Sequence, residues 1–368
     1  MTVESGALRG EVIDGVRRWA PPQRPLSWAG QRGATANAPG CLQLVTPDGF
    51  GPWTKEYVTP APVSEDCLYA NVWVPAEFNG QPRPILVWIH GGAFMSGSNS
   101  VPIYDGSELA KKGVIVISIN YRLGVFGFAA FRELADEVGG GANFGLQDIV
   151  ASLDWVQRNA AAFGGDPAQV TIAGQSAGAM AVHTLLVSPA SSGLFSRAIA
   201  QSGVIETPLP VREEGYRRGD DLRLRAATGS LADLRRMPAD RIMALLSQGP
   251  LAGTAQIGET SLLGPIIDGS AWLRRSTGQR AIARHYTPII LPTANPGQGL
   301  TCSGVSFGGN PLCLQLSRRF AMAKLCRQGP ADRPVWHVEL LGEFSRNPPI
   351  QTGQVCHAGR NSIATIPQ

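Results

Sequence analysis

The sequence of 368 residues lacks any apolar run of about 18 residues or more, so we expect no segment of it to span a bilayer. Its first residues, MTVESGALRG, have neither a basic start nor an apolar core. This predicts that the protein has no signal peptide and is cytoplasmic. No charge sign dominates, since 32 basic and 28 acidic residues give a net charge of +4. So small an excess predicts neither a nucleic-acid partner nor a membrane-surface partner.

Metal-ligand spacing is also missing. The six cysteines, at positions 41, 67, 302, 313, 326 and 356, form no CxxC pair. We therefore expect no metal and no cofactor. Glycine and proline are plentiful, at 44 and 28 residues, and predict many loops. The length suits one large α/β domain or two ordinary ones, and nothing in the sequence sets the oligomeric state.

Periodicity predicts alternating strands and helices. Continuous apolar runs at 85–90 and 113–121 are typical of strands buried on both faces. Further strands are expected at 68–75, 170–174, 197–203, 287–291 and 333–342. The segment 143–167 reads as a helix that Gly164 and Gly165 end, and a second helix is expected from Ala177 to Val187. This alternation favours an α/β fold with a mostly parallel central sheet and helices on both faces.

Two stretches give weaker signals. Residues 206–285 hold no strong strand, and the mixed arginines and acids of 212–241 are typical of a solvated helical face. Residues 292–331 are rich in glycine, proline and serine, and we assign no element there.

The pentapeptide Gly174-Gln175-Ser176-Ala177-Gly178 stands between a predicted strand and a predicted helix. A strand that turns directly into a helix strains the turn residue and brings it close to neighbouring chain, and glycines two positions away remove side chains that would clash. The serine hydroxyl is then held clear at the helix N-terminus. GxSxG can also arise by chance in a glycine-rich chain. The flanking strand and helix favour a nucleophile elbow with Ser176 as nucleophile.

A nucleophilic serine needs donors for the developing oxyanion. The stretch HGGAF, residues 90–94, directly follows a predicted buried strand, where the N–H groups of a tight glycine turn can point at a carbonyl oxygen. An ordinary strand-to-loop turn is the alternative. We expect the N–H groups of Gly92, Ala93 and Ala177 to form the oxyanion hole.

These motifs occur among longer stretches that together resemble the type B carboxylesterases, the cholinesterase-like branch of the α/β-hydrolases. The matching stretches are SEDCLYANVWVP (64–75), WIHGGAFMSGS (88–98), NYRLGVFGF (120–128), NFGLQDIVASLDWVQRNAAAFGGDPAQVTIAGQSAGA (143–179) and SRAIAQSG (196–203). The resemblance implies an α/β-hydrolase fold and small-molecule carboxylic esters as substrates. It also implies that Cys41 and Cys67 form a disulfide.

The resemblance is dense over about residues 1–270. It implies one domain over residues 1–368, with apparent internal deletions near 17–19 and in 292–350 compared with typical members of the family.

The general base should be a histidine late in the chain, since the triad order in α/β-hydrolases is serine, acid, histidine. His90 belongs to the HGG turn, and we expect His183 to pack against the sheet. His285 precedes a strand and His337 lies within one. His357 follows the last predicted strand and resembles the family's histidine motif, so we expect it to be the base. The alternative for His357 is a solvated tail residue.

The acid of the triad is not visible. The family has a glutamate after the strand that corresponds to 287–291, but no Asp or Glu occurs between Asp268 and Asp332. Gln298 occupies about the place of that glutamate. An amide from Gln298 or Asn295 could orient a histidine ring but would not stabilise an imidazolium as a carboxylate does. Three carboxylates remain as substitutes if the shortened region folds differently: Asp332, Glu339 and Glu343.

Two functions therefore stay open. One is a serine carboxylesterase that works through an acyl-enzyme, with reduced activity because the acid is missing. The other is a catalytically impaired or non-catalytic cholinesterase-like interaction protein. The intact GxSxG and HGGAF motifs favour the first, and the missing acid favours the second.

Overall fold

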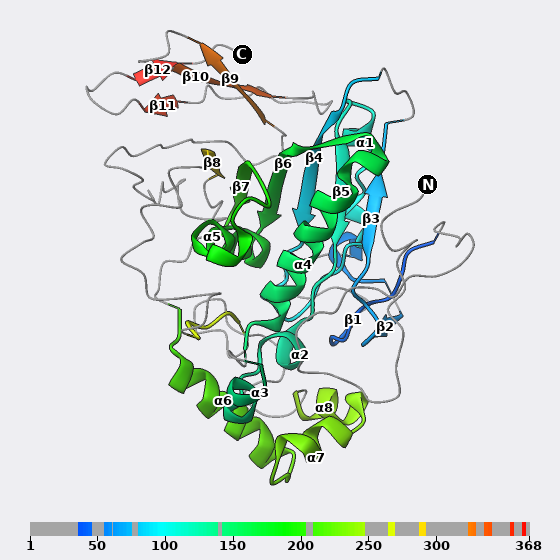
Figure 1. Ribbon diagram of the computed structural model, residues 1–368, viewed down its shortest axis with the longest axis vertical. Helices are drawn as coiled ribbons and strands as arrows, with labels where there is room; N and C mark the ends of the chain where they lie inside the picture. The colour runs from blue at the N-terminus through cyan, green and yellow to red at the C-terminus, as the bar shows by residue number, and fades with distance from the viewer. Residues whose placement is uncertain are drawn as a thin grey trace. The chain divides into compact units, whose positions relative to one another are not determined.

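The computed structural model describes residues 36–45, 55–60, 62–75, 80–138, 142–203, 209–246, 264–268, 287–291, 323–328, 335–340, 354–356 and 363–365 (Figure 1). Contacts divide the chain into two compact units, residues 1–290 and 291–368. Each unit is described by itself.

The first unit is built on a six-stranded sheet with the order β3-β5-β4-β6-β7-β8. The strands are β3 (Ala70–Trp73), β4 (Arg83–Ile89), β5 (Ile115–Ile119), β6 (Gly165–Gln175), β7 (Arg197–Gln201) and β8 (Thr287–Leu291). β4, β5, β6 and β7 pair in parallel, whereas β3 pairs antiparallel with β5. Every strand expected between residues 68 and 291 is present, and the sheet is mainly parallel, as the sequence predicts.

The helices of the first unit follow the predicted alternation with the strands (Figure 1). They are α1 (Ser107–Ala110), α2 (Gly124–Phe128), α3 (Arg132–Val138), α4 (Phe144–Asn159), α5 (Ala177–Val187), α6 (Arg212–Arg225), α7 (Leu231–Arg236) and α8 (Ala239–Leu246). A 3₁₀ turn, Ala160–Phe163, extends α4 and ends at Gly164, whose φ of 75° is left-handed. This confirms that glycine ends this helix.

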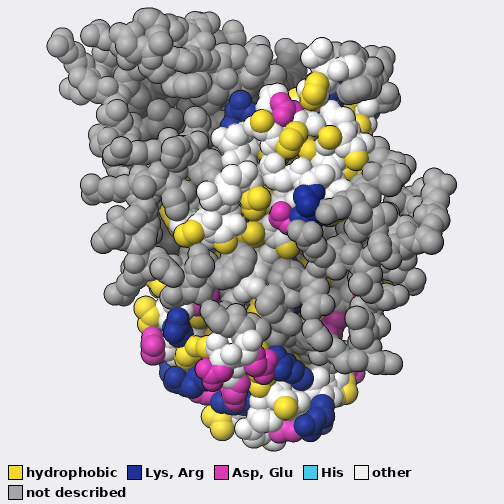
Figure 2. All heavy atoms as spheres, in the orientation of Figure 1, with side chains coloured by type: hydrophobic (Ala, Val, Ile, Leu, Met, Phe, Trp, Pro, Cys, Tyr) yellow, Lys and Arg dark blue, Asp and Glu magenta, His cyan; other side chains and the backbone are white. Residues whose placement is uncertain are grey.

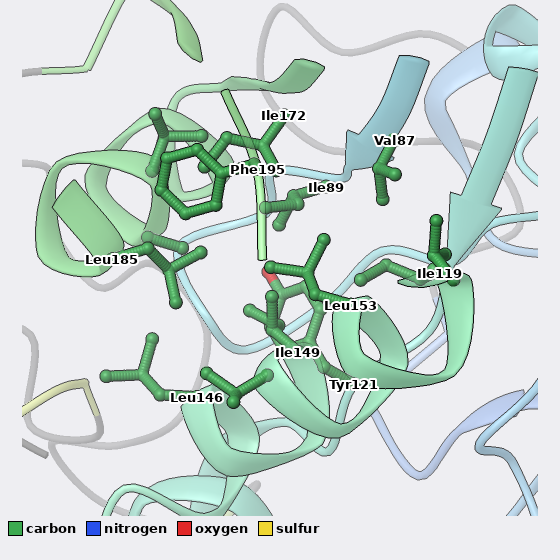
Figure 3. Packing of buried hydrophobic residues seen from close by; sticks show 14 of the residues in the cluster. Val87, Ile89, Ile119, Tyr121, Leu146, Ile149, Leu153, Ile172, Leu185 and Phe195 are labelled. Carbon is green, nitrogen blue, oxygen red and sulfur yellow. The ribbon is translucent and has the colours of Figure 1, made fainter. Parts of the chain in front are cut away.

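The main core lies where α4 and α5 pack on the sheet (Figure 3). Leu146, Ile149 and Leu153 repeat at helical spacing on α4, and they pack in one cluster with the apolar side chains of β4, β5 and β6. Leu185 of α5 joins the same cluster. Burial of these side chains supplies the main driving force for folding at about 25 cal/mol per Å² of apolar surface. It also holds the N-terminus of α5 at the end of β6.

A second apolar cluster joins α6, α7 and α8 to α2 and α3, with Phe131 and Leu234 among its fully buried members. Figure 2 shows basic and acidic side chains gathered together over these helices. Arg217 pairs with Glu214 at 2.7 Å, and Arg235 pairs with Glu137 at 2.7 Å. The charged helical face expected for 212–241 is therefore present, and its charges neutralise one another locally.

Close to the described N-terminus, β1 (Gly40–Cys41) pairs in parallel with β2 (Val63–Ser64). The structure contains a disulfide between Cys41 and Cys67, with Cα atoms 4.8 Å apart, which is the pair that the resemblance implies. It closes a loop over a sequence separation of 26 residues. In the chain-entropy account such a loop stabilises the fold by about 3 kcal/mol.

The second unit contains two antiparallel strand pairs. β9 (Ala323–Gln328) pairs with β10 (Val335–Leu340), and β11 (Gln354–Cys356) pairs with β12 (Ile363–Thr365). β10 confirms the strand expected at 333–342. β9 lies in a segment where no element was predicted, because residues 292–331 are rich in glycine, proline and serine.

None of the helices in the described parts of the chain combines the length and the apolar character that a bilayer crossing requires.

Candidate active site

Ser176 stands at the turn between β6 and α5. Its φ of 56° and ψ of −123° lie outside the regions that non-glycine residues ordinarily adopt. Hydrogen bonds hold the strained backbone on both sides: the Ser176 N–H donates to the Gln201 carbonyl at 2.9 Å, and the Met180 N–H donates to the Ser176 carbonyl at 3.0 Å. The side chain is half-buried. Such over-determined strain is typical of a functional serine.

Glycines make this turn possible because neighbouring backbone fills the space of their missing side chains. A Cβ on Gly174 would lie 2.5 Å from the Gly178 carbonyl oxygen, and one on Gly203 would lie 2.3 Å from the Ser176 carbonyl oxygen. A Cβ on Gly91 would come within 3.2 Å of the Ser176 Cβ. The HGG turn therefore lies directly against the elbow.

The turn after β4 also has unusual backbone. Gly92 has φ of 108°, and Ala93 and Phe94 have φ of 54° and 60°. The Gly92 carbonyl accepts hydrogen bonds from the N–H groups of Met95 and Ser96, at 2.9 and 3.0 Å, which closes the turn. Ala93 is exposed while Phe94 is buried in the core. The turn thus presents its backbone beside Ser176 and is fixed by Phe94.

The three expected donors are available in this arrangement. Among the described residues, no acceptor is found for the N–H groups of Gly92, Ala93 or Ala177. Ala177 is the first residue of α5, where an N–H has no partner within the helix and the helix dipole is positive. The structure therefore brings together Ser176 and backbone donors suited to a developing negative charge.

His90 is 0 % exposed and lies beneath the turn. Its ring stacks on Tyr121 with centroids 4.4 Å apart, and its Nδ1 lies 2.9 Å from the Gly91 carbonyl oxygen. Burial lowers the pKa of His90 to about 4, although the Gly91 hydrogen bond opposes this effect. Burial likewise raises the pKa of Tyr104 to about 12, against the opposing hydrogen bond from the Gly91 backbone. All these groups are neutral near pH 7.

His183 and Ser202 lie on α5 and directly after β7, respectively. His183 lies on α5, is half-buried, and has a pKa lowered by burial. Ser202 follows β7, is half-buried and has a φ of 50°. β7, like β6, therefore ends at an abrupt turn, where Gly203 packs against the elbow.

The remaining expected site residues lie mostly outside the described residues. These are His357, Gln298, Asn295, His285, Asp332 and Glu343. His337 and Glu339 are in β10, opposite Cys326 and Lys324 of β9. The base and the acid therefore stay predictions.

Two polar links across the fold were not predicted from the sequence. Arg122 and Asp148 form a bidentate ion pair, with Nε–Oδ2 at 2.7 Å and Nη2–Oδ1 at 2.6 Å. Asn143, with φ of 60°, donates to the Ile266 carbonyl and accepts from its N–H, both at 2.9 Å. Both links start from stretches that carried the resemblance, but pairing across the fold has no signature in a single sequence.

Comparison with known proteins decides the family. A profile described as the carboxylesterase family matches residues 14–303. The chain belongs to the carboxylesterase family. Its architecture is accordingly that of an α/β-hydrolase, and the resemblance found in the sequence is confirmed.

Several relatives each match more than half of this chain. A fumonisin B1 esterase of Sphingopyxis macrogoltabida is 39% identical over 254 residues, which are 68% of this chain and 45% of that protein. Carboxylesterase 3B of Mus musculus is 42% identical over 64% of this chain and 40% of its own length. A cholinesterase of Mus musculus is 42% identical over 58% of this chain and 35% of its own length. The chain thus spans less than half the length of each of these relatives.

Proposed function

We propose that this protein hydrolyses carboxylic esters of small molecules through an acyl-enzyme on Ser176. The observation that carries the proposal is the strained elbow of Ser176, with unpartnered backbone N–H groups beside it among the described residues. The family is named for this activity, and the relatives above that bear esterase names support it.

The reaction divides into two halves. The Ser176 Oγ attacks the ester carbonyl carbon while His357 takes the hydroxyl proton. The carbonyl oxygen becomes an oxyanion and accepts hydrogen bonds from Gly92, Ala93 and Ala177. The C–O bond to the alcohol breaks, and the alcohol leaves with the proton from His357. Water then attacks the acyl-enzyme in the same way and releases the acid.

The backbone donors supply a large part of the rate. They are fixed before the substrate arrives, so no reorganisation is needed as charge develops. One such donor is worth about 10²–10³ in kcat. The elbow contributes by holding the nucleophile at the positive end of α5.

A second candidate function is a non-catalytic or impaired interaction protein on the same fold. It is favoured by the absence of any acidic residue between Asp268 and Asp332, where the family's triad glutamate is expected. Loss of the triad carboxylate costs about 10⁴ in turnover in a serine protease. We therefore propose weak activity, confined to activated esters.

The cytoplasm is the compartment that we propose from the sequence, and the disulfide bears on it. Disulfides persist mainly in oxidising compartments. In a reducing cytoplasm, Cys41 and Cys67 would be alkylated as thiols when cells are lysed in iodoacetamide. An intact Cys41–Cys67 bridge under those conditions would indicate an oxidising compartment instead.

Hydrolysis of p-nitrophenyl acetate tests the activity. We expect the wild type to turn over this ester and Ser176→Ala to lose all of the enzymatic rate. Ser202→Ala is the matched control, because Ser202 also ends a strand with positive φ. Retention of activity by Ser176→Ala would refute the assignment, and loss with Ser202→Ala alone would transfer the role to that residue.

A further inference from the structure

Each proposed oxyanion donor belongs to a peptide unit whose carbonyl oxygen is already held. A peptide is planar and trans, so its C=O and N–H point in opposite directions, and fixing the oxygen also fixes the direction of the N–H. The Gly92 carbonyl, in the peptide that carries the Ala93 N–H, accepts from the backbone of Met95 and Ser96. The Ser176 carbonyl, in the peptide of the Ala177 N–H, accepts from the Met180 backbone.

For the third donor, the Gly92 N–H, a side chain rather than backbone holds the carbonyl oxygen of the same peptide. The Gly92 N–H shares its peptide with the Gly91 carbonyl, and that oxygen lies 2.9 Å from Nδ1 of His90. A carbonyl oxygen can only accept, so Nδ1 carries the hydrogen and Nε2 carries the lone pair. Nε2 is buried without a hydrogen-bond partner among the described residues, which agrees with the neutral ring in this tautomer.

The His90 ring is itself held from several sides. It stacks on Tyr121, with 17° between the ring planes, and the Tyr121 hydroxyl donates to the His90 carbonyl at 2.9 Å. Gly97, with φ of 109°, packs on the ring so closely that a Cβ there would lie 2.4 Å from Nδ1. The carbonyl oxygen of the peptide between His90 and Gly91 is therefore held by the Tyr121 hydroxyl.

From these contacts we infer that His90 is a positioning residue for the reaction, whose Nδ1–H aims the Gly92 N–H at the oxyanion through the Gly91 carbonyl. The inference rests on the proposed function, since it concerns the same site. His90 touches no substrate and transfers no proton. Its hydrogen bond also polarises the peptide, which strengthens the Gly92 donor. Its low pKa keeps the ring neutral at working pH, so no charge is buried beneath the site.

The test replaces His90 by two side chains of the same shape. Asn in His90→Asn keeps an N–H donor close to the position of Nδ1, whereas Leu in His90→Leu has the same branching and no donor. We expect His90→Asn to keep kcat on p-nitrophenyl acetate within about threefold of the wild type. We expect His90→Leu to lose tenfold or more in kcat, with KM changed little. Complete removal of one oxyanion donor lowers kcat by roughly 10²–10³, and the substitution should cause part of that loss.

A trifluoromethyl ketone reports on the oxyanion hole separately. The inhibitor forms a tetrahedral adduct with the serine. In His90→Leu its inhibition constant should therefore rise in parallel with the loss of kcat, while KM stays constant. His183→Leu is the control, because it removes the half-buried histidine of α5 and should leave kcat and the inhibition constant unchanged. A uniform loss of stability without this split between kcat and KM would show a purely structural role and overturn the inference.

A second substitution covers a failure of His90→Leu to fold. His90→Gln keeps an amide but carries it one bond further out, away from the Gly91 oxygen, and we expect it to show the same loss relative to His90→Asn. Equal kcat in the Asn and Gln variants would overturn the inference. Folding of every variant is checked by thermal unfolding.

The tautomer provides a test that does not need activity. In a long-range ¹H–¹⁵N NMR spectrum of ¹⁵N-histidine-labelled protein, the His90 signals, assigned by their absence in His90→Asn, should show a neutral ring protonated at Nδ1. Protonation at Nε2 would overturn the inference even if the enzyme is active. Absence of any turnover that depends on Ser176, with the Nδ1–H tautomer present, would instead contradict the proposed function.

Discussion

Gly178 lies so close to the carbonyl oxygen of Ile89 that a Cβ on the glycine would stand 2.1 Å from that oxygen. Ile89 is the last residue of β4 and directly precedes His90 and the glycine turn. Gly178 is the second residue of α5. The elbow helix and the oxyanion turn are therefore in backbone contact, which only glycine at position 178 permits.

Gly178→Ala should damage both stability and activity. The added methyl forces α5 away from β4, and overpacking of this kind costs roughly 1–3 kcal/mol in unfolding free energy. Ester hydrolysis should fall by tenfold or more, because a shift of about 1 Å in a positioned group can cost about 10² in rate. Urea unfolding and p-nitrophenyl acetate kinetics measure the two effects.

Gly229→Ala is the matched control for this change. A Cβ on Gly229 meets nothing within 4 Å. We expect that variant to be as stable as the wild type or slightly more stable, since alanine restricts the unfolded chain. Equal behaviour of the two variants would contradict the close packing of α5 on β4.

The buried pair of Arg122 and Asp148 should be a strong determinant of stability. The Asp148 side chain is 1% exposed and that of Arg122 is 12% exposed. Asp148→Asn removes the negative charge that faces the largely buried guanidinium, and breaking a buried pair in this way costs about 3–5 kcal/mol. Chemical denaturation gives the difference in unfolding free energy.

An exposed ion pair gives the comparison. Lys111 and Glu108 are in contact on α1 and its C-cap, with side chains 70% and 78% exposed. Glu108→Gln should therefore change the unfolding free energy little, because solvent screens the exposed pair. A loss as large as that of Asp148→Asn would mean that burial does not set the strength of these pairs.

Acid should destabilise the fold through the buried histidines. The pKa of His90 is lowered from 6.5 to about 4 by burial, so between these values the unfolded chain binds a proton that the folded chain does not. The unfolding free energy therefore falls as the pH drops from about 6.5 to 4, by up to roughly 3 kcal/mol from this group, and this loss levels off below the folded pKa. Burial also lowers the pKa of His183, which acts in the same direction.

The quantity to measure is the slope of the unfolding free energy against pH, not its value at one pH. The pKa of carboxylates such as Glu214 is lowered, chiefly by the hydrogen bond with Arg217. Their contribution to the unfolding free energy is therefore also lost as the pH falls, and this loss is the same in every variant. His90→Asn should flatten the slope between pH 6.5 and 4, and His183→Asn should flatten it less. An unchanged slope in His90→Asn would show that His90 does not titrate as a buried neutral group.

Much of the fold was predictable from the sequence because its signals are local. The apolar runs of β4 and β5, the glycine after α4 and the GxSxG pattern each depend on neighbours in the chain. Ser176 could be assigned for the same reason. The surroundings of His90 could not, since Tyr121 and Gly97 reach it only in the folded chain. The positive φ of Ser202 was not predictable either, because it depends on how Gly203 packs against the elbow.

Gln298→Glu should raise activity. Gln298 takes about the place of the family's triad acid, and a carboxylate there would hold the correct tautomer of His357 and stabilise its protonated form. We expect turnover of p-nitrophenyl acetate to increase tenfold or more, an order-of-magnitude expectation from the value of a triad carboxylate. Gln298→Ala should leave it near the wild-type rate. No gain with glutamate would mean that another residue already supplies the acid.

The nucleophilic role of Ser176 is tested most directly by mapping the site of a fluorophosphonate label. The reagent phosphonylates a serine that is activated and faces an oxyanion hole, so peptide mass spectrometry of the labelled protein identifies the nucleophile. We predict one modified peptide, with the label on Ser176, and no labelling of Ser176→Ala. A label on Ser202, or an unlabelled wild type that is folded by circular dichroism, would contradict the account.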